Sequence, residues 1–277
     1  MQKHKFTYSV LIFGYAFLYI PLVTLVVYSF NASKQVTLWG GFSTKWYVAL
    51  FENEALLSAA WVSLKVATFS ASIAIIIGTL ASVVIVKFNR FKSMTFFKTL
   101  VAAPMLIPEV IIGLALLLVF VNLEKLIGWP KGGVDTITIA HATISIAYVT
   151  AVVTTRLSNV DPMLLEAAQD LGAHPAKAFF VITLPLIYPS LLSGWLLSFI
   201  LSFDDVVVAS FVSGPDSSTL PMVIFSSIRF GLTPQVNALA TLMISFVAII
   251  IVGVSILNDR QRKILINPED PDETPTV

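Results

Sequence analysis

Three carboxylates interrupt otherwise apolar runs of this sequence. Glu109 follows Pro108 in a long hydrophobic stretch, and Asp204 and Asp205 lie near the end of another. A carboxylate inside a bilayer costs several kcal/mol, about 2.5–3.5 on insertion scales, so such residues face the interior of a helix bundle and mark a pathway. The chemistry they suit is the binding of a cation. The two aspartates could instead cap the helix or bond to the loop that follows it.

A stripe of small and polar residues precedes these aspartates. Gly194, Ser198, Ser202 and Asp205 recur at steps of four, four and three, which places them near one face of a helix. Such a face is typical of a helix-packing seam or a pore wall. The sequence alone leaves both open.

An aromatic stripe accompanies it. Trp195, Phe199 and Phe203 recur at steps of four. They could hold an alkylammonium group by cation–π contact, although such stripes more often pack against lipid or neighbouring helices. The candidate substrate-pathway residues are Glu109, Asp204, Asp205, Trp195, Phe199 and Ser202.

A histidine lies in another apolar run. We interpret His141 as a hydrogen-bonding packing residue, because no second histidine lies at metal-ligand spacing and the chain has no cysteine. His4 and His174 lie outside the apolar runs. An intramembrane enzyme would need convergent His, Glu or Asp sets. The sequence therefore predicts neither a catalytic site nor a metal site.

The composition places most of the chain in lipid. Of 277 residues, 57% are hydrophobic and 12% charged, with a mean hydropathy of +0.88, whereas soluble domains carry roughly 25% charged residues. A helix needs about 20 mostly apolar residues to cross a bilayer. Six stretches predict membrane-spanning helices: Tyr8–Phe30, Leu64–Val86, Thr99–Leu123, Thr136–Thr155, Leu186–Val208 and Val236–Leu257. Pro104 and Pro108 predict a kink or break in the third, where exposed carbonyls would suit a cation.

Basic residues orient the predicted helices. With the N-terminus inside, eleven of the 17 lysines and arginines fall in inner segments and five in outer ones, with Lys65 at the edge of the second span. Because inner loops carry the excess of Lys and Arg, both termini are predicted to be cytoplasmic. The 16 acidic residues leave a net charge of +1, which gives no support to nucleic-acid binding.

The inner segment between the fourth and fifth spans predicts two short helices. Asp161 suits an N-cap, with Pro162 at the first helical position. Gly172 can adopt the left-handed conformation that ends this helix. Pro175 would start the second helix and Pro185 would end it. On these features alone, the segment could be an amphipathic connector on the membrane surface.

The spacing within this segment is more specific. E-A-A at residues 166–168 is followed by three residues, Gly172, nine residues, and I-x-L-P at residues 182–185. This pattern resembles the signature loop of the binding-protein-dependent inner-membrane components of ATP-binding-cassette (ABC) importers. The resemblance implies an all-helical type I ABC importer permease with six spans and both termini inside. It also implies that four residues contact an ATP-binding subunit: Glu166, Ala167, Ala168 and Gly172.

The chain contains no G-x-x-x-x-G-K-[ST] phosphate loop. We therefore expect ATP and Mg²⁺ to bind a partner ATPase subunit, with no cofactor in this chain. The resemblance further implies a second homologous permease, two ATP-binding subunits, a periplasmic or extracellular binding protein, and a place in the bacterial inner membrane.

Three more stretches, residues 103–120, 194–215 and 233–241, resemble polyamine permeases, and residues 26–47 and 179–190 favour the putrescine type over the spermidine type. This likeness implies the second membrane subunit of a polyamine importer. The alternative is the same architecture importing another small cation or organic ion.

The predicted organisation has three parts. Residues 1–56 form the first spanning helix and an outer loop, and residues 57–258 form the core permease domain with the coupling loop 156–185. Residues 259–277 form an acidic, Pro-rich cytoplasmic tail that is expected to be disordered.

Overall fold

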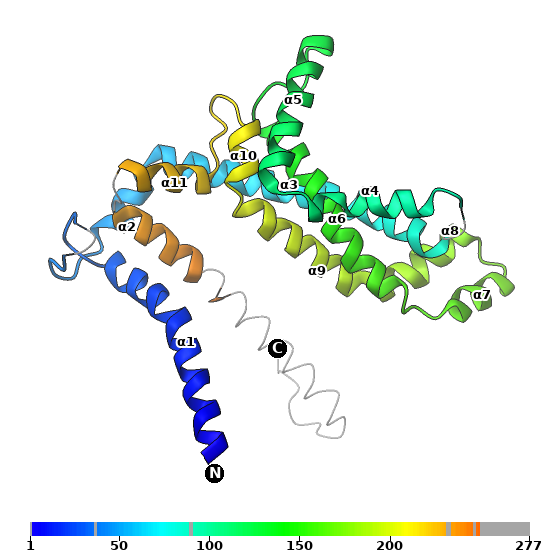
Figure 1. The fold of residues 1–277 in the computed structure, drawn as a ribbon, viewed down its shortest axis with the longest axis horizontal. Helices are drawn as coiled ribbons and strands as arrows, with labels where there is room; N and C mark the ends of the chain where they lie inside the picture. Colours follow the sequence, from blue (N-terminus) through cyan, green and yellow to red (C-terminus); the bar gives the residue numbers. More distant parts are fainter. Residues whose placement is uncertain (1, 36–37, 89–90, 231–233, 246–247, 250–277) are drawn as a thin grey trace, which may run out of the picture. The chain divides into compact units, whose positions relative to one another are not determined.

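The computed structural model of the protein describes residues 2–35, 38–88, 91–230, 234–245 and 248–249. Helices dominate these residues (Figure 1). The chain forms two compact units, Ala55–Ser226 and the combination of Met1–Glu54 with Ser227–Val277. The predicted tail 259–277 lies outside the described residues.

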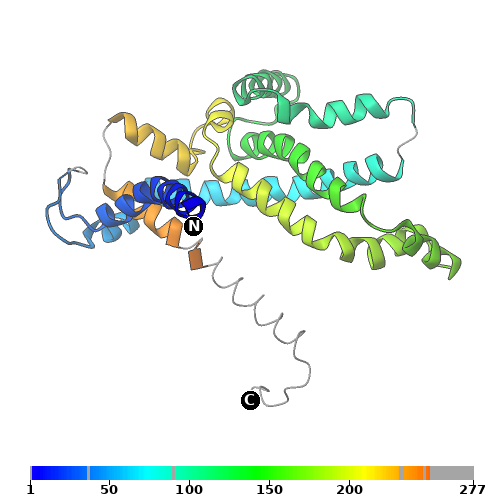
Figure 2. The same ribbon diagram turned by 60° about the horizontal axis from the view of Figure 1, so that its bottom comes forward.

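Three long helices form the centre of the unit Ala55–Ser226. They are α3 (Glu54–Lys87), α6 (Val134–Leu157) and α9 (Leu184–Phe203), which run side by side in Figures 1 and 2. Small residues allow this close approach. A Cβ on Gly78 of α3 would lie only 2.6 Å from a methyl group of Val149 in α6. The Ser82 hydroxyl of α3 also donates to the Thr150 carbonyl of α6 over 3.1 Å.

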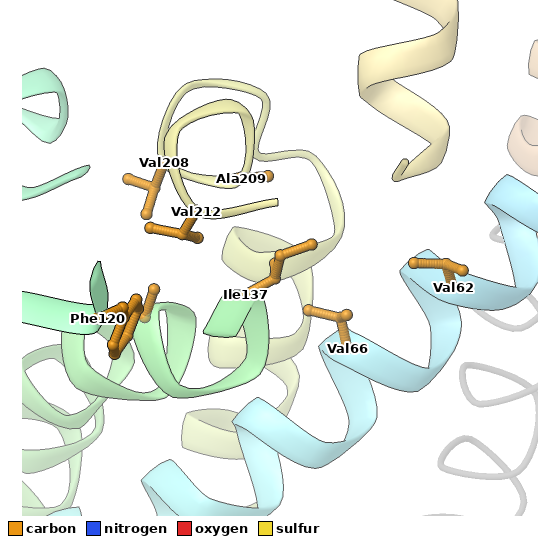
Figure 3. Packing of buried hydrophobic residues seen from close by; sticks show 8 residues of the cluster. Val62, Val66, Phe120, Ile137, Val208, Ala209 and Val212 are labelled. Carbon is orange, nitrogen blue, oxygen red and sulfur yellow. The ribbon is translucent and has the colours of Figure 1, made fainter. Parts of the chain in front are cut away.

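A buried apolar cluster ties the other helices of this unit to the centre. Figure 3 shows its members brought together from four helices: Val62 and Val66 of α3, Phe120 of α5 (Glu109–Ile127), Ile137 of α6, and Val208, Ala209 and Val212 of α10 (Val207–Val212). Within a bilayer, such side chains hold helices together by van der Waals packing. The cluster therefore fixes α10 and the start of α6 against α3 and α5.

The predicted third span is two helices. α4 (Met94–Leu106) ends at Ile107, and α5 begins at Glu109. The two residues between them are extended, with ψ of 133° at Ile107 and 135° at Pro108. In a continuous helix the carbonyl of Pro104 would need an amide hydrogen from residue 108, which proline lacks. The predicted break is confirmed, and a single helix over Thr99–Leu123 is wrong.

The predicted fifth span is also interrupted. α9 ends at Phe203, and α10 starts only at Val207, so a helix continuing to Val208 is wrong. The physical reason is the pair Asp204 and Asp205. Asp204 follows the last residue of α9, and the Asp205 side chain bonds to the first amides of α10.

The start of the fifth span corrects another prediction. Pro185 does not end a helix: α8 (Pro175–Ala178), a π-helical turn η1 (Phe179–Thr183) and α9 follow one another without a break. Pro185 lies in the first turn of α9. Its ring would meet the Val181 carbonyl in a regular helix, and that carbonyl lies within the wider π turn.

The other unit contains α1 (Gln2–Ser29) and α2 (Lys45–Phe51). The loop between them is organised around the buried Asn31, whose Nδ2 donates to the Leu38 carbonyl over 2.7 Å and whose Oδ1 accepts from the Gly40 amide over 2.7 Å. Trp46 of α2 donates to the Asn31 carbonyl over 2.6 Å. These bonds give the predicted outer loop a defined structure.

Five helices are long and apolar enough to cross a membrane within the part of the chain that the structure describes: Phe6–Ser29, Glu54–Lys87, Glu109–Ile127, Val134–Leu157 and Pro175–Phe203. Residues 236–245 and 248–249 of the predicted sixth span are helical. The rest of that span lies outside the described residues. α11 (Leu220–Phe230) precedes it.

Candidate functional site

A depression lined by polar and apolar side chains lies where the two interrupted spans meet α6. It contains about 350 Å³ of space between atoms, which includes open solvent. Glu109 contributes from the start of α5, and Asp205 from the break between α9 and α10. Its lining residues are Glu109, His141, Ile144, Ser145, Tyr148, Leu201, Ser202 and Asp205. Three of the predicted pathway residues, Glu109, Ser202 and Asp205, are thus brought together.

The Asp205 carboxylate is held by three donors. Its Oδ2 accepts from the Ala209 amide over 2.8 Å and from Nε2 of His141 over 3.0 Å. Its Oδ1 accepts from the Val208 amide over a longer 3.3 Å. These bonds satisfy two amides in the first turn of α10, whose N-cap position is occupied by Val206. Since each carboxylate oxygen has about two lone pairs, Oδ1 keeps acceptor capacity for a further donor.

His141 connects this carboxylate to two serines. Its Nδ1 lies 2.7 Å from the Ser202 hydroxyl of α9, which accepts from the Ser70 hydroxyl of α3 over 3.0 Å. A neutral imidazole satisfies every bond: Nε2–H donates to the carboxylate, which only accepts, and Nδ1 accepts from Ser202. The interpretation of His141 as a buried hydrogen-bonding residue is confirmed.

Serine, histidine and aspartate in contact also invite comparison with a hydrolase triad. The Ser202 side chain, however, is buried in the body of α9, where it packs beside Ser70. The amides nearest Asp205, those of Val208 and Ala209, already donate to its carboxylate and so cannot stabilise an oxyanion. The arrangement holds a carboxylate in place rather than activating a nucleophile.

Glu109 contributes to the depression from a different helix, α5. It is the first residue of α5 and follows the extended Pro108, so its carboxylate lies at the positive end of the helix dipole. Its side chain is exposed. The depression is therefore lined by one carboxylate that hydrogen bonds hold in place and by one that is accessible.

The remaining predicted pathway residues lie elsewhere. Asp204 is exposed and is not part of the lining. Trp195 and Phe199 stack with ring centroids 5.4 Å apart, and the Trp195 indole donates to Ser72 of α3 over 3.2 Å. Phe203 extends the stack at 5.6 Å. The depression does not bring these four residues together with Glu109.

The small-residue stripe divides between two roles. Gly194 and Ser198 are buried, and Gly194 packs beside Ile75 and Val149. This part is a helix-packing seam. Ser202, one turn further along, bonds to His141 and lines the depression.

The lining contains residues that the sequence analysis did not select. Ser145 and Tyr148 follow His141 at steps of four and three, so one face of α6 carries all three. That spacing of polar groups within a predicted span was the signal available for finding them. Ser70 of α3 lies behind the lining, where no local pattern marks it.

The first helix of the predicted coupling segment forms as expected. α7 (Pro162–Asp170) starts with Asp161 as its N-cap, whose carboxylate accepts from the Met163 amide over 2.9 Å. Gly172 has φ of +84°, the left-handed conformation predicted for it. Glu166 and Ala167 are exposed, and the following Leu171 is 89% exposed. An accessible helix of this kind offers a surface to another protein.

The described residues contain no group of three or more His, Cys, Asp or Glu side chains that could hold a metal ion. The polar network at His141 involves one histidine and one carboxylate in direct contact.

Residues 74–264 match the family of binding-protein-dependent transport system inner membrane components. The chain belongs to that family. It is an inner-membrane transport subunit, not an enzyme.

Two relatives show how far the likeness extends. The chain is 52% identical over 242 residues to the putrescine transport system permease protein PotI of Escherichia coli. The aligned region covers 87% of this chain and 86% of that protein. The chain is 40% identical over 239 residues to the spermidine/putrescine transport system permease protein PotC of Escherichia coli, covering 86% and 88%.

Solved structures share the fold at lower identity. A bacterial ABC transporter involved in the import of the acidic polysaccharide alginate aligns with a TM-score of 0.70 and 17% identity, covering 94% of this chain and 96% of that one. The alginate transporter in complex with an alginate-pentasaccharide-bound periplasmic protein gives a TM-score of 0.66 at 17% identity, covering 91% of each. These neighbours establish the ABC importer permease fold.

Proposed function

We propose that this chain is one of two membrane subunits of an ATP-driven polyamine importer and forms half of the translocation pathway. The observation that carries the proposal is the pair of carboxylates, Glu109 and Asp205, that line one depression. The likeness to putrescine and spermidine/putrescine permeases supports a polyamine as the cargo. Putrescine is the better candidate because the identity to the putrescine permease is higher.

Polyamines are flexible chains with ammonium groups at their ends. In the pathway the carboxylates replace part of the water around these groups. Asp205 offers Oδ1, and Glu109 offers an exposed carboxylate at the start of α5. Cargo must enter such a site and also leave it, so each contact needs to be weak. Two separate acids each bind an ammonium group weakly, whereas a tight cluster of acids would hold the cargo too strongly for release.

Asp204, Trp195 and Phe199 remain predictions for other points along the same pathway. The stacked rings of Trp195 and Phe199 offer faces for an alkylammonium group. Contact with cargo requires a conformation in which the face of α9 that carries Trp195 and Phe199 lines the pathway.

The proposed partners are a second homologous permease, two ATP-binding subunits and a polyamine-binding protein outside the membrane. Glu166, Ala167, Ala168 and Gly172 contact the ATP-binding subunit through the exposed face of α7. ATP and Mg²⁺ bind that subunit, and its closure moves α7 and rocks the helices behind it between two orientations.

The proposed topology has six spans with both termini in the cytoplasm. The sixth span continues the helical residues 234–245. The excess of Lys and Arg in the inner segments supports this orientation. It places α7 on the cytoplasmic side, where the ATP-binding subunits are.

The test is the ATPase activity of the purified complete complex in proteoliposomes, with its binding protein loaded with putrescine, with spermidine, or with neither. We expect polyamine-loaded binding protein to stimulate hydrolysis. The alternative is an importer of the same build for another small cation or organic ion. If binding protein loaded with putrescine or spermidine does not stimulate ATP hydrolysis, the polyamine proposal is contradicted and that alternative is favoured.

A further inference from the structure

We infer that His141 is a positioning residue for the transported cation: it fixes the Asp205 carboxylate so that Oδ1, and not Oδ2, faces the pathway. This inference rests on the proposed function, because it assumes that the depression lies on the cation's route. The inference assigns His141 the role of orienting a carboxylate that binds the cation.

The first step of the argument is the occupancy of the two carboxylate oxygens. Oδ2 receives both strong donors, the Ala209 amide at 2.8 Å and His141 Nε2 at 3.0 Å. Oδ1 receives only the Val208 amide at 3.3 Å. Since two donors fill the lone pairs of Oδ2, an arriving ammonium group finds its acceptor at Oδ1.

The second step concerns what keeps the carboxylate in this orientation. The two amides belong to the short helix α10, three and four residues after Asp205 in the chain. His141 approaches from a different helix, α6. Without the imidazole, each carboxylate oxygen would have one amide donor, so a flip of the side chain would exchange Oδ1 and Oδ2 and either oxygen would be left to face the pathway.

The third step is the support of His141 itself. The Ser202 hydroxyl holds Nδ1 at 2.7 Å, and Ser70 holds Ser202 at 3.0 Å. The chain of bonds therefore runs from α3 through α9 and α6 to Asp205. A ring with nitrogens on two edges can bridge Ser202, in α9, and Asp205, in the break that follows α9.

Burial matches this task. The His141 side chain is 2% exposed, whereas that of Asp205 is 11% exposed. The imidazole is thus covered, and the acid that it holds reaches the surface of the depression. His141 acts on the cation through Asp205 and needs no contact with it.

The test is a double-mutant cycle in the complete reconstituted complex, with ATP-dependent uptake of labelled putrescine as the readout. The variants are His141→Leu, Asp205→Asn and both together. Loss of a hydrogen bond to a charged group changes such a readout by about tenfold. We expect His141→Leu alone to lower uptake about tenfold and to have no further effect in the Asp205→Asn background, because its task disappears with the carboxylate.

A conservative variant and an assembly measurement complete the cycle. His141→Gln retains an amide donor and is expected to recover a large part of the uptake lost in His141→Leu. Copurification of the partner subunits is expected to be unchanged in each variant. If His141→Leu prevents assembly, His141→Asn, whose shorter amide cannot bridge Ser202 and Asp205, takes its place in the cycle.

Two results would overturn the inference in distinguishable ways. Independent effects, in which the double variant loses roughly the product of the two single losses, would give His141 a purely structural role and leave the proposed function intact. Full uptake by Asp205→Asn would remove this acid from the pathway, and the task assigned to His141 with it. Absence of polyamine uptake by the unmodified complex would contradict the proposed function itself.

Discussion

His141 and Asp205, 64 positions apart in the chain, meet through a hydrogen bond of 3.0 Å between Nε2 and Oδ2. The bond joins α6 to the break between α9 and α10 and makes an intramembrane acid part of a packed network. A charged group in a membrane protein normally pairs inside the bundle. Here the pairing leaves Oδ1 with acceptor capacity in the depression that Glu109 also lines.

Glu109→Gln tests the second acid of the depression. The substitution keeps the size of the side chain and removes its charge, so we expect slower polyamine uptake, by about tenfold, because the ammonium group loses a charge-assisted contact. The decrease is measured from the initial rate of labelled putrescine uptake.

The matched control is Glu124→Gln, at the other end of α5 and outside the depression. We expect uptake near that of the unmodified complex. Equal uptake by Glu109→Gln and Glu124→Gln would remove Glu109 from the pathway.

Glu166→Gln tests the coupling surface. Removing one partner of a buried, hydrogen-bonded charge pair across an interface costs about 2–5 kcal/mol, largely because the other charge is left buried and unpaired. We therefore expect at least a tenfold loss of binding-protein-stimulated ATPase activity. The control is Asp170→Asn, the other exposed acid on α7. A larger loss for Asp170→Asn than for Glu166→Gln would contradict the assignment.

Gly78→Ala tests the seam between α3 and α6. The added Cβ would lie 2.6 Å from a methyl group of Val149, so we expect a destabilisation of about 1–3 kcal/mol from overpacking. The thermal midpoint of the purified complex in detergent measures this. Gly14→Ala in α1, where a Cβ meets nothing within 4 Å, is the control. An unchanged midpoint in Gly78→Ala would show that the helices can move apart freely.

The absence of cysteine from the chain makes the topology directly testable. Leu171→Cys lies just after α7, at a position 89% exposed, and Phe42→Cys lies in the loop before α2, at a position 73% exposed. In intact cells whose outer barrier is permeabilised, a membrane-impermeant maleimide is expected to label Phe42→Cys only. In inside-out vesicles it is expected to label Leu171→Cys only. Labelling of both from one side would contradict the proposed orientation.

Much of the helical framework could be predicted from local sequence. Apolar length defined the spans, and Pro104 and Pro108 marked the break before Glu109, because a missing amide hydrogen acts at a known position. The N-cap at Asp161 and the left-handed Gly172 are equally local features, and both were predicted.

The errors have a common physical origin. Pro185 is compatible with a continuous helix because a π turn precedes it, and hydropathy alone does not reveal such a turn. α9 stops at Phe203 although the apolar run resumes at Val206, because the Asp205 side chain accepts from the Val208 and Ala209 amides. Each outcome depends on a competition between hydrogen bonds.

The site was predictable only in part. Glu109, Ser202 and Asp205 were selected because polar groups in apolar runs require an explanation. The link from His141 to Ser202 and Asp205 spans 61 and 64 positions, so it arises from packing of α6 against α9 rather than from any local pattern.

The most direct test of the central claim is ATP-dependent accumulation of labelled putrescine in proteoliposomes that contain the complete complex, comparing the unmodified chain with the double variant Glu109→Gln, Asp205→Asn. The variant complexes are first shown to assemble with all partner subunits. The account predicts accumulation by the unmodified complex and a loss of more than about tenfold in the double variant, since both charge-assisted contacts disappear. Equal accumulation by the two complexes would contradict it.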